Sequence, residues 1–114
     1  MQRSEILIVG GGPTGTALAV ALAQAGRRPL VVDARTADAA RNDKRILALS
    51  HGSQQILERL GVWSAIAATP IGTIHVSQQG GFGRTLLHAA DYGVPALGYV
   101  AAAASVSAAL TDRL

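Results

Sequence analysis

Apolar runs and a helical repeat alternate along the first third of the chain. Ile6–Val9 is an unbroken aliphatic run, which predicts a strand buried on both faces, as in a parallel sheet. After a glycine-rich turn, apolar residues recur at helical spacing over Leu18–Ala25, and Gly26 is a typical residue to end that helix. Leu30–Val32 is a second buried run. The pattern predicts a strand–helix–strand unit over about residues 4–35, with parallel strands.

The next forty residues carry weaker signals. Ala34–Lys44 is polar and alanine-rich without a clear period, which indicates a loop with at most a short helical turn. Ser53 is the expected cap of a helix that ends at Arg59, with Ile56 and Leu60 on one face and Gly61 as its stop. A second short helix is predicted over Trp63–Ala68, before a proline.

Alternation and turn signals dominate the last third. Apolar and polar residues alternate from Ile74 to Gln79, the glycines that follow indicate a turn, and Arg84–His88 is the expected return strand of a hairpin. Gly98–Val100 starts another strand, and a final helix is predicted over Ser105–Leu114. We therefore expect an α/β fold: a Rossmann-like βαβ unit with parallel strands and a small β-hairpin insertion.

Composition narrows the possible functions. The 114 residues are enough for one domain, and 49% hydrophobic against 15% charged residues favours a folded chain. There is no cysteine, and the three histidines lie too far apart in sequence to form a local metal-ligand pair, so we predict no metal site. The net charge is +3, but no block of basic residues with interleaved aromatics occurs, which argues against nucleic-acid binding.

The most specific motif lies between the first predicted strand and the first predicted helix. It has the spacing Gly10-x-Gly12-x-x-Gly15. Gly10 would permit a tight turn, Gly12 would let a diphosphate approach the backbone, and Gly15 would let the helix pack against the strand. The helix N-terminus would then bind the diphosphate. A flexible linker is the alternative, and the flanking strand and helix disfavour it.

An acidic residue ends the second predicted strand. Asp33 follows Gly15 by 18 residues, the position at which a carboxylate accepts hydrogen bonds from a ribose diol and repels a 2′-phosphate. A solvated strand-end residue is the alternative. The motif and this acid together indicate a dinucleotide site, and on these residues alone either FAD or NAD would suit it.

The chain resembles the group A FAD-dependent aromatic hydroxylases, which share the fold of para-hydroxybenzoate hydroxylase. The resemblance rests first on Gly10–Gly15, with Pro13 after the triple glycine, and on Leu30–Asp33, where the family usually has glutamate. It extends along nearly the whole chain. Two narrower segments, Asp43–Ser50 and Leu60–Trp63, are similar to the ubiquinone-biosynthesis branch. Two others, Ile74–Ser77 and Gly93–Val100, are especially similar to hydroxylases of 2-polyprenyl-6-methoxyphenols.

This resemblance implies FAD as cofactor, NAD(P)H as transient reductant, and O₂ and a polyprenylated phenol as substrates. It implies a cytoplasmic enzyme with peripheral contact at the inner membrane surface, and leaves the oligomeric state open. Pro13 and Thr14 would join the glycines at the cofactor, and Arg45 would lie over it. Arg35 would flank the adenine or ribose. Solvated surface arginines are the alternative for both.

The resemblance also sets limits on what this chain does. The family's later cofactor motifs and most of its substrate region would lie beyond position 114, so residues 1–114 would be the N-terminal portion of an FAD-binding domain. We expect no catalytic residue among them and no hydroxylation by the chain alone. The family often has a polar, cofactor-touching residue ahead of the last helix, where this chain has Ala101–Ala104, with Ala103 in that place.

Two other readings remain open from the sequence. One is an NAD-binding dehydrogenase module, which Pro13 and the irregular pattern after Asp33 disfavour. The other is a non-enzymatic folding or interaction module with a vestigial motif, which the alanine run favours.

Overall fold

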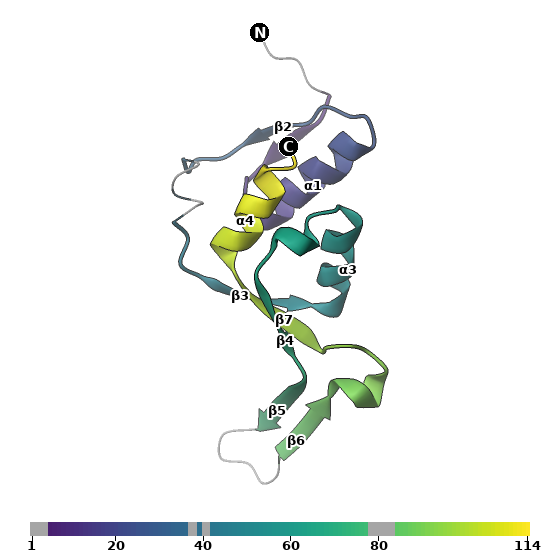
Figure 1. Cartoon of the computed structure of the whole chain (residues 1–114). Coiled ribbons are helices and arrows are strands. Elements are labelled where there is room, and N and C mark those ends of the chain that lie inside the picture. Colours follow the sequence, from purple (N-terminus) through teal and green to yellow (C-terminus); the bar gives the residue numbers. More distant parts are fainter. Residues whose placement is uncertain (1–4, 37–38, 40–41, 78–83) are drawn as a thin grey trace.

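The structure is a computed structural model that describes residues 5–36, 39, 42–77 and 84–114. Its elements form three small sheets flanked by helices (Figure 1). A parallel strand pair with its helix occupies one end of the molecule, a β-hairpin occupies the other, and an antiparallel sheet lies between them. The fold is mixed α/β, as the sequence predicted.

The predicted strand–helix–strand unit is confirmed. β1 (Leu7–Val9), α1 (Pro13–Gln24) and β2 (Leu30–Val32) follow one another, and the two strands pair in parallel with Ile8 opposite Val31. Gly26 has a φ of +82°, the left-handed conformation that ends many helices and favours glycine.

The expected burial of this unit is only half right. Ile8 is buried and would lie 3.3 Å from a Cβ added at Gly15, so it faces α1. Leu7 and Val9 point to the opposite face and are 62% and 80% exposed. The prediction of a strand buried on both faces is therefore wrong for the described residues, because α1 covers one face of a sheet with only two strands.

The structure contains a three-stranded antiparallel sheet of which the sequence pattern predicted only one strand, the one that begins at Gly98. Its order is β3 (Ile46–Ser50), β7 (Gly98–Ala102) and β4 (Ala68–Ile71). The helix predicted over Trp63–Ala68 is wrong, because only Trp63–Ala65 forms a single 3-10 turn, η1, and Ala68 is already the first residue of β4. β4 is an edge strand, where its proline is tolerated.

The helix predicted from Ser53 begins earlier. α3 spans His51–Arg59, and the Ser50 side chain caps it by accepting a hydrogen bond from the Ser53 backbone N–H at 3.0 Å. The predicted apolar face is right at Leu60, which is buried, and wrong at Ile56, which is 55% exposed while its neighbour Leu57 is buried.

The last helix also begins earlier than predicted. α4 spans Ala103–Thr111, and Ala102 is its N-cap. The alanine run thus joins the end of β7 to the first turn of α4. Ala101 and Ala103 are almost fully buried there, so small side chains suit these two positions.

The predicted hairpin is confirmed in its strands. β5 (Thr73–Ser77) and β6 (Arg84–His88) pair antiparallel, and the 3-10 turn η2 (Ala89–Tyr92) follows. The turn predicted at Gln79-Gly80-Gly81 lies outside the described residues. The hairpin extends away from the rest of the chain (Figure 1).

One hydrophobic core joins the helices to the central sheet. It comprises Val20, Leu57, Leu60, Val62, Ile66, Ala101, Val106, Ala109 and Leu110. The glutamine Gln24 of α1 donates to the Leu60 carbonyl at 2.7 Å, and Arg113 donates to the Gly61 carbonyl at 2.9 Å. These contacts fix α1 and α4 against α3, and the glycine turn therefore sits on a packed scaffold.

Candidate functional site

Two glycines of the turn between β1 and α1 are required by the backbone itself. Gly10 has a φ of +108°, which side chains other than glycine rarely adopt, and its N–H donates to the Val32 carbonyl at 2.7 Å. A Cβ added at Gly15 would collide with the Gly10 carbonyl oxygen. The close approach expected at Gly15 is thus present in the structure.

Gly12 has neither constraint. Its φ is −73°, and an added Cβ would meet only the Arg35 Nη2 atom, at 3.8 Å. Gly12 is the N-cap of α1 and makes no side-chain hydrogen bond to the helix, while Pro13 occupies the first turn. The N–H groups of the first turn, including those of Thr14 and Gly15, therefore have no side-chain cap, and the space around the Cβ position of Gly12 is open. A helix start of this kind attracts anions.

The Asp33 carboxylate lies directly on the glycine turn. Its Oδ2 accepts a hydrogen bond from the Gly11 N–H at 2.6 Å, and its Oδ1 accepts one from the Arg35 N–H at 2.7 Å. These two backbone hydrogen bonds and the Arg35 charge lower the pKa of Asp33 below its ordinary value. The motif and the acid, 18 residues apart in sequence, form one cluster.

Gly11 is a residue that the sequence reasoning missed. An added Cβ there would lie 3.1 Å from the Asp33 Oδ2 atom, so the middle glycine gives the carboxylate room to reach the turn. The only sequence signal was a third consecutive glycine, which the motif itself does not require.

A cavity of about 350 Å³ opens beside this cluster. Asp33 and Arg35 line one side of it, together with Gly11 and Thr16. The opposite side comes from α4 and the residues after it. The complete lining is Gly11, Thr16, Val31, Asp33, Arg35, Thr36, Ser107, Ala108, Thr111, Asp112 and Leu114. The contribution of α4 was not predicted, since no local pattern marks residues more than 70 positions away from Asp33.

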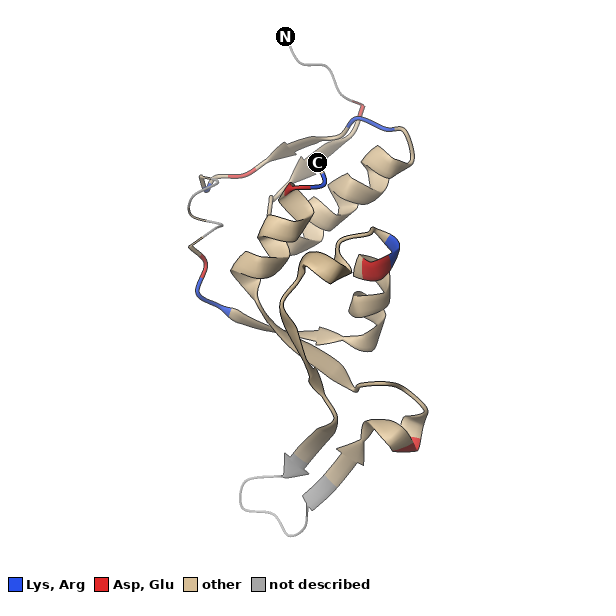
Figure 2. Cartoon of the chain, viewed as in Figure 1, with Lys and Arg blue, Asp and Glu red and all other residues tan. Residues whose placement is uncertain are grey.

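Arg45 immediately precedes β3, and it is not among the described residues that line the cavity. Its Nη2 donates to the Asp43 Oδ2 at 2.7 Å and its Nε to Oδ1 at 3.0 Å. Its carbonyl accepts from the Ala103 N–H at 2.9 Å, so Arg45 is anchored beside the first turn of α4. Acidic and basic segments alternate along the chain between β2 and β3 (Figure 2).

The alanine that replaces an expected polar residue is not at the surface. Ala103 is 0% exposed and belongs to the first turn of α4. A longer polar side chain at Ala103 would have to enter the core. The exposed position ahead of the helix is the N-cap, Ala102, which makes no side-chain hydrogen bond.

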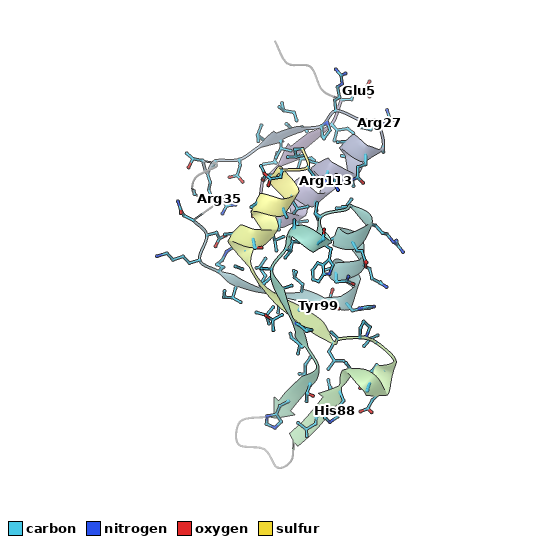
Figure 3. The ribbon with its side chains drawn as sticks, in the orientation of Figure 1. Glu5, Arg27, Arg35, His88, Tyr99 and Arg113 are labelled. Carbon is cyan, nitrogen blue, oxygen red and sulfur yellow. The ribbon has the colours of Figure 1, made fainter. Side chains whose placement is uncertain are left out.

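The histidines lie apart from this cluster. His88 makes a 3.1 Å contact with Thr73 on the hairpin, at the far end of the molecule from Arg35 (Figure 3). The His51 Nδ1 is buried without a hydrogen-bond partner at the start of α3. Within the described ranges, no three acidic or histidine side chains gather as a metal site would require. In the same part of the chain, no helix combines the length and the hydropathy needed to cross a membrane.

Curated relatives resemble parts of this chain. The 3-demethoxyubiquinol 3-hydroxylase of Escherichia coli (strain K12) is 44% identical over 71 residues, which cover 59% of this chain and 18% of that protein. The ubiquinone hydroxylase UbiM of Neisseria meningitidis is 37% identical over 72 residues, which cover 60% of this chain and 16% of that protein. The chain thus spans less than a fifth of either relative.

Solved structures show the same fold over nearly the whole chain. The p-nitrophenol 4-monooxygenase PnpA from Pseudomonas putida DLL-E4 aligns with a TM-score of 0.69 and 20% identity, over 95% of this chain and 28% of that one. The rebeccamycin biosynthetic enzyme RebC aligns with a TM-score of 0.63 and 25% identity, over 96% of this chain and 24% of that one.

The family comparison agrees with the geometry. The family model described as the FAD binding domain matches residues 3–103, a range that includes the glycine turn, Asp33 and Arg45. The chain therefore belongs to this family, the FAD binding domain family.

Proposed function

We propose that this chain is the N-terminal, FAD-binding portion of a flavin-dependent monooxygenase. The observation that carries this proposal is the contact between Asp33 and the glycine turn, beside the uncapped start of α1. It brings an acceptor for ribose hydroxyls next to donors for a diphosphate. The family match and the hydroxylase fold support the same cofactor.

The residues of the turn fit the cofactor's diphosphate. Space is open where a Cβ at Gly12 would stand, although neither the backbone nor the packing requires glycine there. A phosphate that approached this point would face the first turn of α1, at Pro13, Thr14 and Gly15. Gly10 and Gly15 would act indirectly, by setting the turn and the helix position.

The Asp33 carboxylate would orient the ribose. Each carboxylate oxygen can accept more than one hydrogen bond, so both retain capacity beyond the bonds from Gly11 and Arg35. Its lowered pKa keeps it ionised at neutral pH. The negative charge would oppose a 2′-phosphate, and Arg35, across from α4 in the cavity, would flank the adenosine.

We infer the wider reaction from the relatives. FAD, when bound, supplies the redox chemistry by which O₂ hydroxylates a phenol with NAD(P)H as reductant. Because the relatives are named as ubiquinone hydroxylases, we propose a polyprenylated phenol in ubiquinone biosynthesis as the substrate of the whole protein. We further propose that the whole protein is cytoplasmic, with peripheral contact at the inner membrane surface because a polyprenyl tail partitions into a bilayer.

Substitution of the acid tests the site. Asp33→Ala removes the carboxylate that would hold the ribose, and we expect it to weaken FAD binding by about tenfold or more, measured by fluorescence titration. Asp91→Ala, at an exposed position of η2, is the matched control and should bind like the parent chain. Unchanged FAD affinity in Asp33→Ala, with an unchanged melting temperature, would refute the ribose assignment.

A further inference from the structure

The loop between β2 and β3 contains the same short ionic unit twice. In Asp33-Ala34-Arg35, the Asp33 Oδ1 accepts from the backbone N–H of Arg35 at 2.7 Å and lies 3.6 Å from its Nε. In Asp43-Lys44-Arg45, the Asp43 Oδ1 accepts from the backbone N–H of Arg45 at 3.0 Å and from its Nε at 3.0 Å. The first unit belongs to the proposed cofactor site. In the second, Arg45 is expected at the cofactor from the family resemblance, while Asp43 has no role assigned so far.

Asp43 connects the two units. Its Oδ2 accepts from the Arg45 Nη2 at 2.7 Å and lies 4.0 Å from the Arg35 Nη1. The four charges therefore alternate in sign from Asp33 through Arg35 and Asp43 to Arg45. This chain of contacts joins Arg45, which lies outside the cavity lining, to the side chain of Arg35, which lines the cavity.

Burial differs sharply along this chain of charges. The Asp43 side chain is 11% exposed, against 44% for Arg35 and 63% for Arg45. The anion is thus the enclosed member, and the arginines extend outward from it. Hydrogen bonds and charge from Arg45 lower the pKa of Asp43 to about 2, so it is ionised throughout the physiological range.

The bidentate contact with Asp43 determines which N–H groups of the Arg45 guanidinium remain free to bind another acceptor. Asp43 engages the Nε and one Nη2 hydrogen, and a guanidinium carries five N–H groups in a fixed plane. Three N–H groups therefore remain for another acceptor, in an orientation set by the carboxylate. An exposed arginine without such a partner samples many rotamers and must lose that freedom when it binds.

We propose that Asp43 is a positioning residue that holds the free edge of Arg45 toward an anionic oxygen of the bound dinucleotide. This inference rests on the proposed function, because it takes FAD as the ligand of Arg45. It predicts that Asp43, which need not touch the cofactor, contributes to FAD affinity only when Arg45 is present.

A double-mutant cycle tests this dependence with the FAD affinity of the 114-residue chain as its readout. We expect Asp43→Asn to weaken FAD binding about tenfold in the parent chain and less than twofold in an Arg45→Ala background. Asp43→Glu, which keeps the charge, should recover part of the lost affinity. Asp91→Asn is the control for loss of an exposed aspartate, and melting temperatures show whether each variant is folded.

The outcomes separate this inference from the proposed function. Equal losses from Asp43→Asn in both backgrounds would show a general structural role and overturn the inference. FAD binding as tight as in the parent chain, in either Asp43→Asn or Arg45→Ala, would also overturn the inference. None of these results would argue against FAD as the cofactor. Failure of the parent chain to bind FAD, or a preference for NADH over FAD, would overturn the proposed function, and the inference with it.

Discussion

At the scale of single residues, the glycines of one turn are there for different physical reasons. Gly10 adopts a left-handed conformation, and Gly15 lies against the Gly10 carbonyl, so both serve the fold. Gly12 has ordinary dihedral angles and space around its Cβ position. We therefore attribute the glycine at position 12 to ligand binding, and the glycines at positions 10 and 15 to the requirements of the backbone.

This division predicts different outcomes for two matched substitutions. Gly15→Ala should lower the free energy of unfolding by about 3 kcal/mol or more, because the new methyl group would meet a backbone carbonyl that cannot easily move. Gly12→Ala should change it by at most about 1 kcal/mol, as at other helix N-caps, while weakening FAD binding. Chemical denaturation and FAD titration measure the two effects. Equal destabilisation by both substitutions would contradict the division.

The ion pair between Asp43 and Arg45 predicts a pH dependence. Because the folded-state pKa of Asp43 is lowered to about 2 from 3.8, its contribution to stability is present above pH 3.8 and is lost as the pH falls toward 2. In Arg45→Ala, the Asp43 pKa should rise toward 3.8, since the first cause of its shift is gone. A carboxyl-carbon NMR titration measures both values. An Asp43 pKa that is the same in both proteins would argue against the bidentate contact.

At the scale of elements, the sequence pattern correctly predicted the helices and strands that are determined by interactions between residues close in sequence. The unit from β1 to β2 and the strands of the hairpin follow from aliphatic runs, glycine spacing and alternation. β3 and β4 were missed because both pair with β7, which lies far away in sequence, and neither has a clean strand pattern. α3 begins earlier than predicted because Ser50 and Ser53 are both good caps, and only the structure shows which of them the helix uses.

The inner face of α3 provides a matched pair of substitutions. Leu57 is 6% exposed in the core, while its neighbour Ile56 is 55% exposed. Leu57→Ala should therefore cost about 2–5 kcal/mol of unfolding free energy, and Ile56→Ala less than about 1 kcal/mol. Urea denaturation distinguishes them. A larger loss from Ile56→Ala would restore the face that the sequence pattern predicted.

At the scale of the whole molecule, only part of the candidate site follows from the sequence. The turn and Asp33 could be predicted because the strand order brings them together. The cavity wall from α4 and the contact between Asp43 and Arg35 depend on tertiary packing, which no spacing rule encodes. Since the chain spans less than a fifth of its curated relatives, membership of the FAD binding domain family is what the comparisons assign to it, and hydroxylation stays part of our proposal.

Equilibrium titration of the purified 114-residue chain with FAD, with NADH as the competing dinucleotide, tests the central claim most directly. We predict saturable FAD binding that is at least tenfold tighter than NADH binding, and weaker FAD binding in Asp33→Ala. Preference for NADH would instead indicate a dehydrogenase module. Absence of binding to either dinucleotide by the folded chain would contradict the assignment of the glycine turn and Asp33 as a cofactor site.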